Sequence, residues 1–331
     1  MRRASAHPKP PADRKTHRMF RLAFALTLSL ATAPALAQVA TFSADDYGKT
    51  DLVFLESSGN ASAYIAAQDG AFEPIRELPA DDPIRRLAAA IGRVDLLEQN
   101  DRGGRDLVTC TGAILPGGWV LTNHHCIPEN ASQRLLAASI LTGYLVQGDK
   151  DTRRYTLSID PADWHSVLDF SLVRMTDIPQ DVLPLLIEDV AVDPGDPLMV
   201  IHHPLGRPQV MTRFRCFALR EQDGGPILRH RCDTQPGSSG SILFDRELRP
   251  VALHHSGGMT PNDDRSFNKS TRLSAILQDS GLLREITGAA ASATPATPPT
   301  APATDVPLES RRAPSGAGLS SGGVTDLLRG N

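Results

Sequence analysis

The chain has 331 residues and a mass of 35.6 kDa, with 40% hydrophobic and 22% charged residues. This suffices for one large domain or two small ones with a hydrophobic core, and it excludes a wholly disordered chain and a multi-pass membrane protein. The formal net charge of -4 divides unevenly, because residues 1–37 hold seven basic side chains and one acidic one, a net +6, which leaves -10 for the rest. An acidic body lacks the basic footprint of a nucleic-acid-binding protein, so nucleic acid is not expected as a partner.

The N-terminal segment has the pattern of an export signal. A basic lead precedes an apolar run from Leu22 to Ala31, and the small-residue motif Ala35-Leu36-Ala37 follows. The run is about a dozen residues long, whereas a membrane span needs about 20, so the pattern predicts a signal peptide at 1–37 that is cleaved after Ala37. We therefore expect a periplasmic or extracellular protein with no stable membrane insertion after cleavage.

Two further segments carry no chemistry that can be recognised. Residues 38–83 contain no motif and are interpreted as an N-terminal extension or propeptide. Residues 287–331 consist mainly of Ala, Thr, Pro, Ser and Gly, a composition that buries too little apolar surface to fold, so a disordered tail is predicted. The informative part of the chain is therefore 84–286.

Short apolar runs rich in β-forming residues follow one another through 84–286, separated by Gly, Pro, Asp and Asn. This pattern predicts many short strands in a mostly antiparallel, all-β sandwich or barrel. No G-x-G-x-x-G follows a strand and no P-loop occurs, which argues against the familiar nucleotide chemistries. The expected strands are Val108–Leu115, Trp119–Thr122, Val167–Met175, Leu198–His202, Ser241–Phe244 and Val251–His254.

Three pieces of this region together supply the parts of a nucleophilic enzyme, although each alone is weak. A histidine pair beside a cysteine ends the run at Thr122–Cys126, an acid starts the run Asp169-Phe170-Ser171-Leu172, and a Ser/Gly-rich loop spans Gly237–Ser241. A serine hydroxyl is a poor nucleophile without a base, and the base needs an acid to orient it. Glycines in the loop allow successive N–H groups to point at one spot, as an oxyanion hole requires.

The order and wording of these motifs resemble the chymotrypsin-fold serine proteases, and most closely their bacterial glutamyl endopeptidase-like branch. Thr122–Cys126 stands where the family has Thr-Ala-Ala-His-Cys, Asp169–Leu172 where it has Asp-Ile-Ala-Leu, and Gly237–Ser241 where it has Gly-Asp-Ser-Gly-Gly. The resemblance covers about 84–286. It implies two antiparallel β-barrels, about 84–190 and 191–286, with the active site in the cleft between them.

The resemblance also implies a role for each matching residue. Ser239 is expected to attack the scissile carbonyl of a polypeptide substrate, His125 to act as its base, and Asp169 to orient the imidazole. The backbone N–H groups of Gly237 and Ser239 are expected to hold the oxyanion. His124 is the rival base, but successive residues of an extended chain face opposite ways, and the motif selects His125. No cofactor or metal is needed.

The specificity pocket gives conflicting indications. Asp233 falls where trypsin-like enzymes keep the acid that binds Arg or Lys, whereas Thr234 and His255 fall where glutamyl endopeptidases keep polar groups for Glu. The segment Leu253-His254-His255-Ser256-Gly257-Gly258 resembles the substrate-binding strand of the family, with Ser256 supporting the catalytic acid and the glycines leaving the mouth of the pocket open. Asp233 has a second interpretation, as an acid that bonds its own loop. The choice between basic and acidic substrates stays open.

One departure from the trypsin group concerns activation. The residue before the nucleophile is an acid in that group and pairs with a newly formed N-terminus, whereas this chain has Ser238. We expect that activation does not depend on such a salt bridge.

Four cysteines allow three pairings, and the sequence alone does not exclude any of them. Export favours disulfides over free thiols. The resemblance, with a disulfide beside the histidine, implies Cys110 with Cys126 and leaves Cys216 with Cys232, which flank an expected hairpin at Gly224–Pro226.

Two other functions compete with this interpretation. Three adjacent histidine pairs could indicate a metal-dependent hydrolase, but neighbours on a strand point apart and no H-E-x-x-H occurs. A catalytically silent binding protein on the same fold is the other alternative, since a fold does not fix a function. The presence of all three triad residues favours the enzyme. The sequence does not indicate an oligomeric state.

Overall fold

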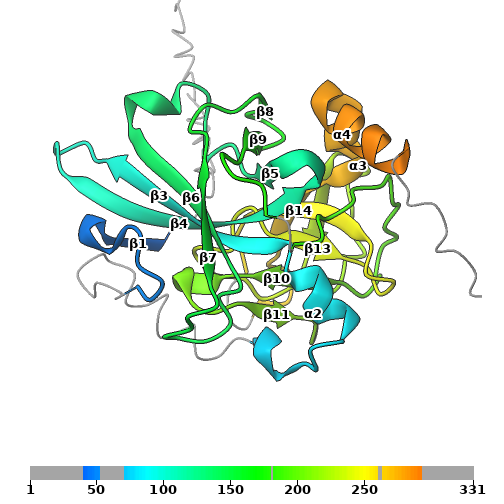
Figure 1. Cartoon of the computed structure of the whole chain (residues 1–331). Helices are drawn as coiled ribbons and strands as arrows, with labels where there is room; N and C mark the ends of the chain where they lie inside the picture. Colours follow the sequence, from blue (N-terminus) through cyan, green and yellow to red (C-terminus); the bar gives the residue numbers. More distant parts are fainter. Residues whose placement is uncertain (1–39, 53–70, 180–181, 260–262, 293–331) are drawn as a thin grey trace, which may run out of the picture. The chain divides into compact units, whose positions relative to one another are not determined.

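The structure, a computed structural model, describes residues 40–52, 71–179, 182–259 and 263–292 (Figure 1). The predicted signal peptide and most of the predicted C-terminal tail lie outside these residues. Among the described helices, none is long and apolar enough to cross a membrane.

The first sheet forms a closed barrel. Its strands pair antiparallel in the order β7, β6, β3, β4, β5, β9, β8, and β1 adds to β4. A bridge between Leu157 and Met175 joins the ends of β7 and β9 and so closes the sheet. The strands are β1 Ala40–Ser43, β3 Ile91–Gln99, β4 Arg105–Leu115, β5 Trp119–Thr122, β6 Leu135–Thr142, β7 Arg153–Leu157, β8 Asp163–His165 and β9 Phe170–Arg174.

The second sheet closes in a similar way. Its order is β12, β15, β14, β13, β10, β11, β2, again antiparallel throughout. Residues 216–219 bridge the segment before β10 to β12, through Pro197 with Phe217 and Ala218 with His230. The strands are β2 Glu73–Pro74, β10 Met199–His202, β11 Val210–Thr212, β12 Ile227–His230, β13 Ile242–Phe244, β14 Pro250–Ser256 and β15 Asn268–Arg272. The predicted all-β fold of two antiparallel barrels is confirmed.

Strand alternation explains why the apolar runs are nearly continuous. In β5, Val120 packs inside the first barrel while Leu121 joins the core between the barrels. In β14, Ala252 packs inside the second barrel while Leu253 meets that same shared core. Because successive side chains point to opposite faces and both faces are buried, these strands need apolar residues at every position.

The six expected strands are present as β4, β5, β9, β10, β13 and β14, and the described residues of 84–286 hold seven further strands that were not among the expected ones. Strands β1 and β2 come from the 38–83 segment, where two-residue and four-residue pieces leave no pattern to recognise. The described part of the chain also holds three α-helices, α2 Pro83–Ala88, α3 Leu273–Asp279 and α4 Gly281–Ser292. Helix α4 runs past 287, where composition places the start of the tail, because alanine is the best helix former and buried Leu283 and Ile286 anchor the preceding turn.

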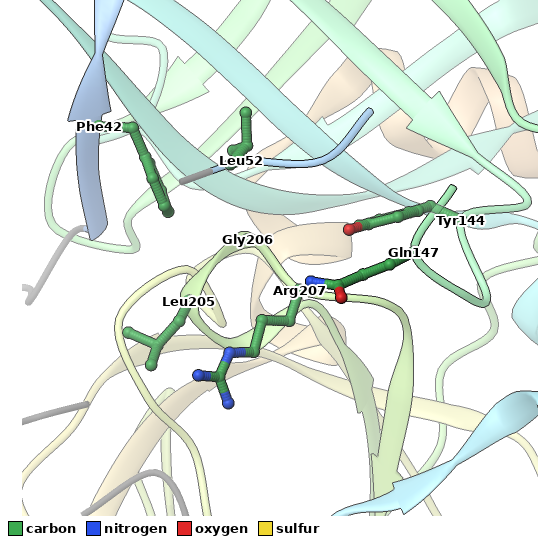
Figure 2. A pocket seen from close by; sticks show the side chains of 7 residues that line it. All are labelled: Phe42, Leu52, Tyr144, Gln147, Leu205, Gly206 and Arg207. Carbon is green, nitrogen blue, oxygen red and sulfur yellow. The ribbon is translucent and has the colours of Figure 1, made fainter. Parts of the chain in front are cut away.

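A separate pocket lies between β1, the turn after β6 and the loop 204–206. Figure 2 shows Phe42, Tyr144 and Leu205 around Gly206. Fully buried Arg93 holds this region together, since its guanidinium donates to the carbonyl oxygens of Lys49, Thr50 and Gly206 and to the Asp95 carboxylate. The pocket is lined by Phe42, Leu52, Tyr144, Gln147, Leu205, Gly206 and Arg207.

The cysteine pairing implied by the resemblance is present. Cys110 is bonded to Cys126, and Cys216 to Cys232, each across a sequence separation of 16 residues. The first disulfide joins β4 to the segment after β5, and the second ties the segment 216–219 to Cys232, three residues before the serine-containing loop 235–241.

Removing the first disulfide should destabilise the fold without unfolding it outright. For a loop of about 15 residues, the loss of cross-linking lowers the free energy of unfolding by about 3 kcal/mol. We expect this decrease in urea unfolding of Cys110→Ala/Cys126→Ala relative to the wild type. A change below about 1 kcal/mol would contradict a clamping role for this bond.

Candidate active site

The turn after β5 positions His125. The carbonyl oxygen of Asn123 accepts from the N–H groups of Cys126 and Ile127, which closes a tight turn around the two histidines. The side chain of Asn123 donates from Nδ2 to the carbonyl oxygen of Asp169 at 2.8 Å. One buried asparagine therefore fixes the histidine turn and the acid relative to each other.

His125 and Asp169 form a direct two-point contact. Asp169 Oδ2 lies 2.7 Å from His125 Nδ1, and Oδ1 accepts from the His125 backbone N–H at 2.9 Å. Asp169 has a φ of 52°, a left-handed conformation that aspartate tolerates better than most residues and that turns both carboxylate oxygens toward the histidine. Nε2 of His125 is buried and has no hydrogen-bond partner in the described part of the chain.

The charge of Asp169 is stabilised where it lies. Burial raises the pKa of this carboxyl group, but the hydrogen bonds from His125 and the charge interactions with His125 and His255 outweigh burial and bring the pKa below its ordinary value. At neutral pH the group is therefore a carboxylate that fixes the imidazole with its Nδ1–H toward the acid.

His124 points elsewhere. Its Nε2 pairs with the Glu129 carboxylate, and its ring packs against the Trp164 ring with centroids 5.3 Å apart. The two neighbouring histidines thus have separate partners, although they lie in a turn after β5 and not in an extended strand.

Thr111 joins the serine-bearing loop to the first barrel. We call residues 235–241 the serine loop. The Thr111 N–H donates to the carbonyl oxygen of Ser239 at 2.7 Å, and its hydroxyl donates to the carbonyl oxygen of Gly237 at 2.8 Å. The Thr111 carbonyl oxygen in turn accepts from the Thr122 hydroxyl at 2.9 Å, one turn before His125. The loop and the histidine turn are therefore held on one residue of β4, next to Cys110.

Two peptide planes of the serine loop are fixed by their carbonyl oxygens. Pro236 O accepts from the Leu205 N–H at 2.6 Å, and Ser238 O accepts from the Ser241 N–H at 3.1 Å. In a planar trans peptide the following N–H points the opposite way, so the N–H groups of Gly237 and Ser239 are turned away from those contacts. Neither donates to an acceptor among the described residues, and both are free to bind an anionic oxygen.

Gly240 allows the serine loop to lie this close to the first barrel. It has a φ of 84°, and a Cβ at this position would lie 2.1 Å from the Thr111 carbonyl oxygen and 2.5 Å from the Thr122 hydroxyl. Only glycine both adopts this positive φ readily and leaves the space of a Cβ empty. Ser239 itself is 5% exposed.

Ser238 is held by a histidine. Its hydroxyl lies 2.7 Å from His202 Nδ1 and accepts from the Gln235 N–H at 3.1 Å, while His202 Nε2 lies 3.2 Å from the Thr212 hydroxyl. Burial lowers the pKa of His202 to about 3, so the ring is neutral at physiological pH. Phe72 packs edge-on against it with centroids 5.4 Å apart. A neutral network thus occupies the position of the acid that the trypsin group uses as a latch.

The residues expected in the specificity pocket have different contacts, and two of them, Thr234 and Gly258, share Asn268 as a partner. The Asp233 carboxylate accepts from the Ala71 N–H at 3.1 Å, and the Thr234 hydroxyl accepts from Asn268 at 3.0 Å. His255 lies beside the pair of His125 and Asp169. Burial lowers the pKa of His255 to about 4, and the charge of Asp169 opposes that effect. The Ser256 hydroxyl donates to the Gly257 carbonyl oxygen at 3.3 Å.

His255 stands outside the strand ladder. The pairing of β14 with β15 shifts register between His254 and Ser256, which leaves His255 unpaired in the ladder. His255 lies close enough to Asp169 to lower the pKa of that carboxyl group, and its Nε2 has no hydrogen-bond partner among the described residues. Gly257 and Gly258 follow directly, and Gly258 donates to the Asn268 side chain at 2.8 Å.

Sequence reasoning missed four residues that build the site: Thr111, Asn123, His202 and Asn268. Each acts through contacts with residues far away in the chain. Only Asn123 stands in one of the recognised motifs, and that motif gives the asparagine no role. The only advance signal was their polar character within or beside apolar strands, because a buried polar group must find partners.

Within the described residues, the group that comes closest to a metal-binding cluster is Cys110, His125 and Cys126. Its two sulfur atoms are bonded to each other in the disulfide, so they are not available as thiolate ligands.

One of three comparisons with known proteins, the family-model match, agrees with the family indicated by the motifs. Residues 110–253 match the family model described as "Trypsin-like peptidase domain", which supports a serine peptidase. Among solved structures, the crystal structure of Deg5 matches with a TM-score of 0.44 and 13% sequence identity over 59% of this chain and 88% of that chain. No curated protein matches the sequence.

Proposed function

We propose that this chain, whose residues 110–253 match a trypsin-like peptidase domain, is an exported serine endopeptidase that uses Ser239, His125 and Asp169. The observation that carries the proposal is the arrangement around Ser239. An ionised Asp169 orients His125, His125 Nε2 is left without a partner, and the N–H groups on either side of Ser238 are unoccupied.

In the proposed reaction, Ser239 Oγ attacks the carbonyl carbon of the scissile peptide bond and His125 Nε2 takes its proton. The carbonyl oxygen becomes an anion and is bound by the N–H groups of Gly237 and Ser239. His125 then gives the proton to the leaving amine, which leaves an acyl-enzyme on Ser239. Water, deprotonated by the same histidine, hydrolyses this ester and restores the enzyme.

No hydrogen bond joins His125 Nε2 to Ser239 Oγ in the described residues. Catalytic hydrogen bonds in substrate-free enzymes are frequently long and shorten in the substrate complex. The proposal therefore requires that substrate binding brings these two atoms together, while the Asp169 contact is formed in advance.

Export is part of the proposal and rests on the predicted signal peptide at 1–37 and on the two disulfides. Cross-linked cysteines persist in the periplasm or outside the cell and are rare in the cytosol. Polypeptides are the proposed substrates. A fluorophosphonate probe, which reacts with activated serines, tests the enzyme reading directly, and chelator-insensitive hydrolysis would exclude the metal-dependent alternative.

The N-terminal segment allows a test of the propeptide interpretation. Ala40, Phe42 and Ile75 are at most 1% exposed, and β1 and β2 each extend a barrel. Deleting 38–82 removes these core side chains, and losing a buried Phe alone costs about 3–5 kcal/mol. We expect the protein that begins at Pro83 to unfold more easily and to react more slowly with the probe than the protein that begins at Gln38.

The variant Phe72→Ala in the full-length exported form is a control that separates the loss of packing from the release of an inhibitor. It keeps the N-terminal segment 38–82 and removes only the ring that packs on His202. Faster probe labelling after the deletion would contradict a structural role and would support a propeptide.

A further inference from the structure

The turn between β8 and β9 brings Asp169 to His125. His165 ends β8 and pairs with Phe170 at the start of β9, so the turn consists of residues 166–169 and Asp169 is its last residue. Asp169 has a φ of 52°, and a residue other than glycine keeps such a conformation only where its surroundings impose it. The contacts that hold this turn therefore also hold the carboxylate against the histidine.

The ring of His165 closes the turn. Its Nδ1 accepts from the backbone N–H groups of Val167 and Leu168, both at 3.1 Å. The second barrel fixes the same backbone from the other end, because the hydroxyl of Thr271 donates to the Leu168 carbonyl oxygen at 2.7 Å. Leu168 thus has both its N–H and its carbonyl oxygen occupied, which fixes the chain that leads into Asp169.

Only a neutral His165 can make these two bonds. A ring nitrogen that accepts carries a lone pair, so the proton of the neutral ring is on Nε2. This is the reverse of His125, whose Nδ1 faces the carboxylate at 2.7 Å. An imidazolium has an N–H at both ring nitrogens and accepts nothing. Protonation of His165 therefore leaves the N–H groups of Val167 and Leu168 without their acceptor.

Acidic groups face the opposite side of the ring. Asp279, the last residue of α3, has Oδ1 4.0 Å from His165 Nε2, and the histidine side chain is 37% exposed, so water reaches it. Asp163 lies on the same face of β8, where its carboxylate accepts from the Ser280 hydroxyl at 2.5 Å. The cross-strand partner, Phe170, carries no charge. The two carboxylates attract a positive ring, whereas the two backbone N–H groups require a neutral one.

We propose that His165 is a positioning residue for the reaction proposed above: the neutral ring holds the turn that presents Asp169 to His125, and protonation of the ring releases that turn. The inference rests on the proposed function. It adds a second proton that lowers activity, besides the proton that occupies the base His125 in acid. His165 itself touches neither the substrate nor the reacting atoms.

The test compares the rates of fluorophosphonate labelling of the wild type and of His165→Asn between pH 8.5 and 5.5, with near-UV circular dichroism to show that both are folded. The amide oxygen of asparagine can accept from the two N–H groups as Nδ1 does, but it does not titrate. The two proteins should label at about the same rate at pH 8.5. At pH 5.5 the variant should label about 10-fold faster than the wild type, because a 1 Å displacement of a catalytic group can cost about 100-fold.

Ser166→Ala is the matched control, because it alters an exposed side chain of the same turn and keeps the titrating ring and both of its bonds. The ratio of its labelling rate to that of the wild type should be the same at every pH. His165→Ala has no acceptor at this place and should label more slowly than His165→Asn at pH 8.5.

Nitrogen-15 NMR of the wild type observes the ring directly and does not depend on any variant. At pH 8.5 the spectrum should show His165 protonated on Nε2 alone. A His165 ring that is protonated on Nδ1, or a ratio of His165→Asn to wild-type labelling that stays constant with pH, overturns the inference. Absence of Ser239-dependent labelling at every pH counts instead against the proposed function.

Discussion

Ser239→Ala should abolish fluorophosphonate labelling and lower kcat for peptide hydrolysis by about 10⁶-fold, with the fold intact. Removing the nucleophile of a serine-protease triad has an effect of this size. The site without its nucleophile retains only oxyanion binding and substrate positioning. The Ser239 hydroxyl makes no hydrogen bond to the described residues that the fold would lose. Labelling in a gel and hydrolysis of an internally quenched peptide library measure the two effects.

Ser241→Ala is the matched control, since Ser241 belongs to the same loop, is fully buried and has an unpartnered hydroxyl. Its contacts to Ser238 and His254 run through the backbone and survive the substitution. We expect wild-type labelling in this variant. Labelling that persists in Ser239→Ala would show that another residue is the reactive nucleophile. Labelling that is absent from the wild type would leave a binding protein on a protease fold as the better interpretation.

The sequence predicts the parts of the site that are local and misses the parts that are assembled. The apolar runs locate β5, β9, β13 and β14 because strand periodicity is a property of the chain itself. The turn Asn123–Cys126 is likewise readable as a motif. His125 and Asp169 come together over 44 residues, and only the resemblance to a family brings them into one prediction.

The assembled parts depend on contacts that no window of sequence contains. Thr111 and Ser239 are 128 positions apart, and their backbone contact exists because two barrels pack together. Strand β2 has two residues and becomes a strand only through its pairing with β11. The register shift between His254 and Ser256 is a single-residue irregularity, below what periodicity can detect.

Buried histidines should make this protein sensitive to acid well above the pH at which carboxylates titrate. Burial lowers the pKa of His202 and His230 to about 3 and that of His203 and His255 to about 4, and it holds the pKa of His254 well below 6.5. In the folded state these rings are neutral, whereas in the unfolded chain each takes up a proton near pH 6.5. Above pH 6.5 the histidines are neutral in both the folded and the unfolded state, so their titration does not change the free energy of unfolding there.

As the pH falls from 6.5 toward 4, the unfolded state binds protons that the folded state rejects, and the free energy of unfolding decreases. Linkage gives roughly 1.4 kcal/mol per pH unit for each such histidine. Several histidines together therefore remove, within about two pH units, an amount comparable to the roughly 5–15 kcal/mol that stabilises a typical domain. Urea unfolding between pH 7.5 and 4.5 measures the free energy of unfolding against pH. This curve should be nearly flat above pH 7 and steep below pH 6, with a slope that corresponds to the uptake of several protons on unfolding.

His203→Asn identifies the histidines as the cause of this slope. The ring of His203 contacts the Arg207 carbonyl oxygen through Nδ1 at 2.9 Å, and an asparagine amide can donate from the same position. The variant keeps that hydrogen bond and removes one titrating group, so its slope below pH 6 should be smaller by about one proton per molecule. A wild-type stability that is independent of pH between 7 and 5 would mean that the buried rings take up protons in place, through water that reaches the barrel interiors.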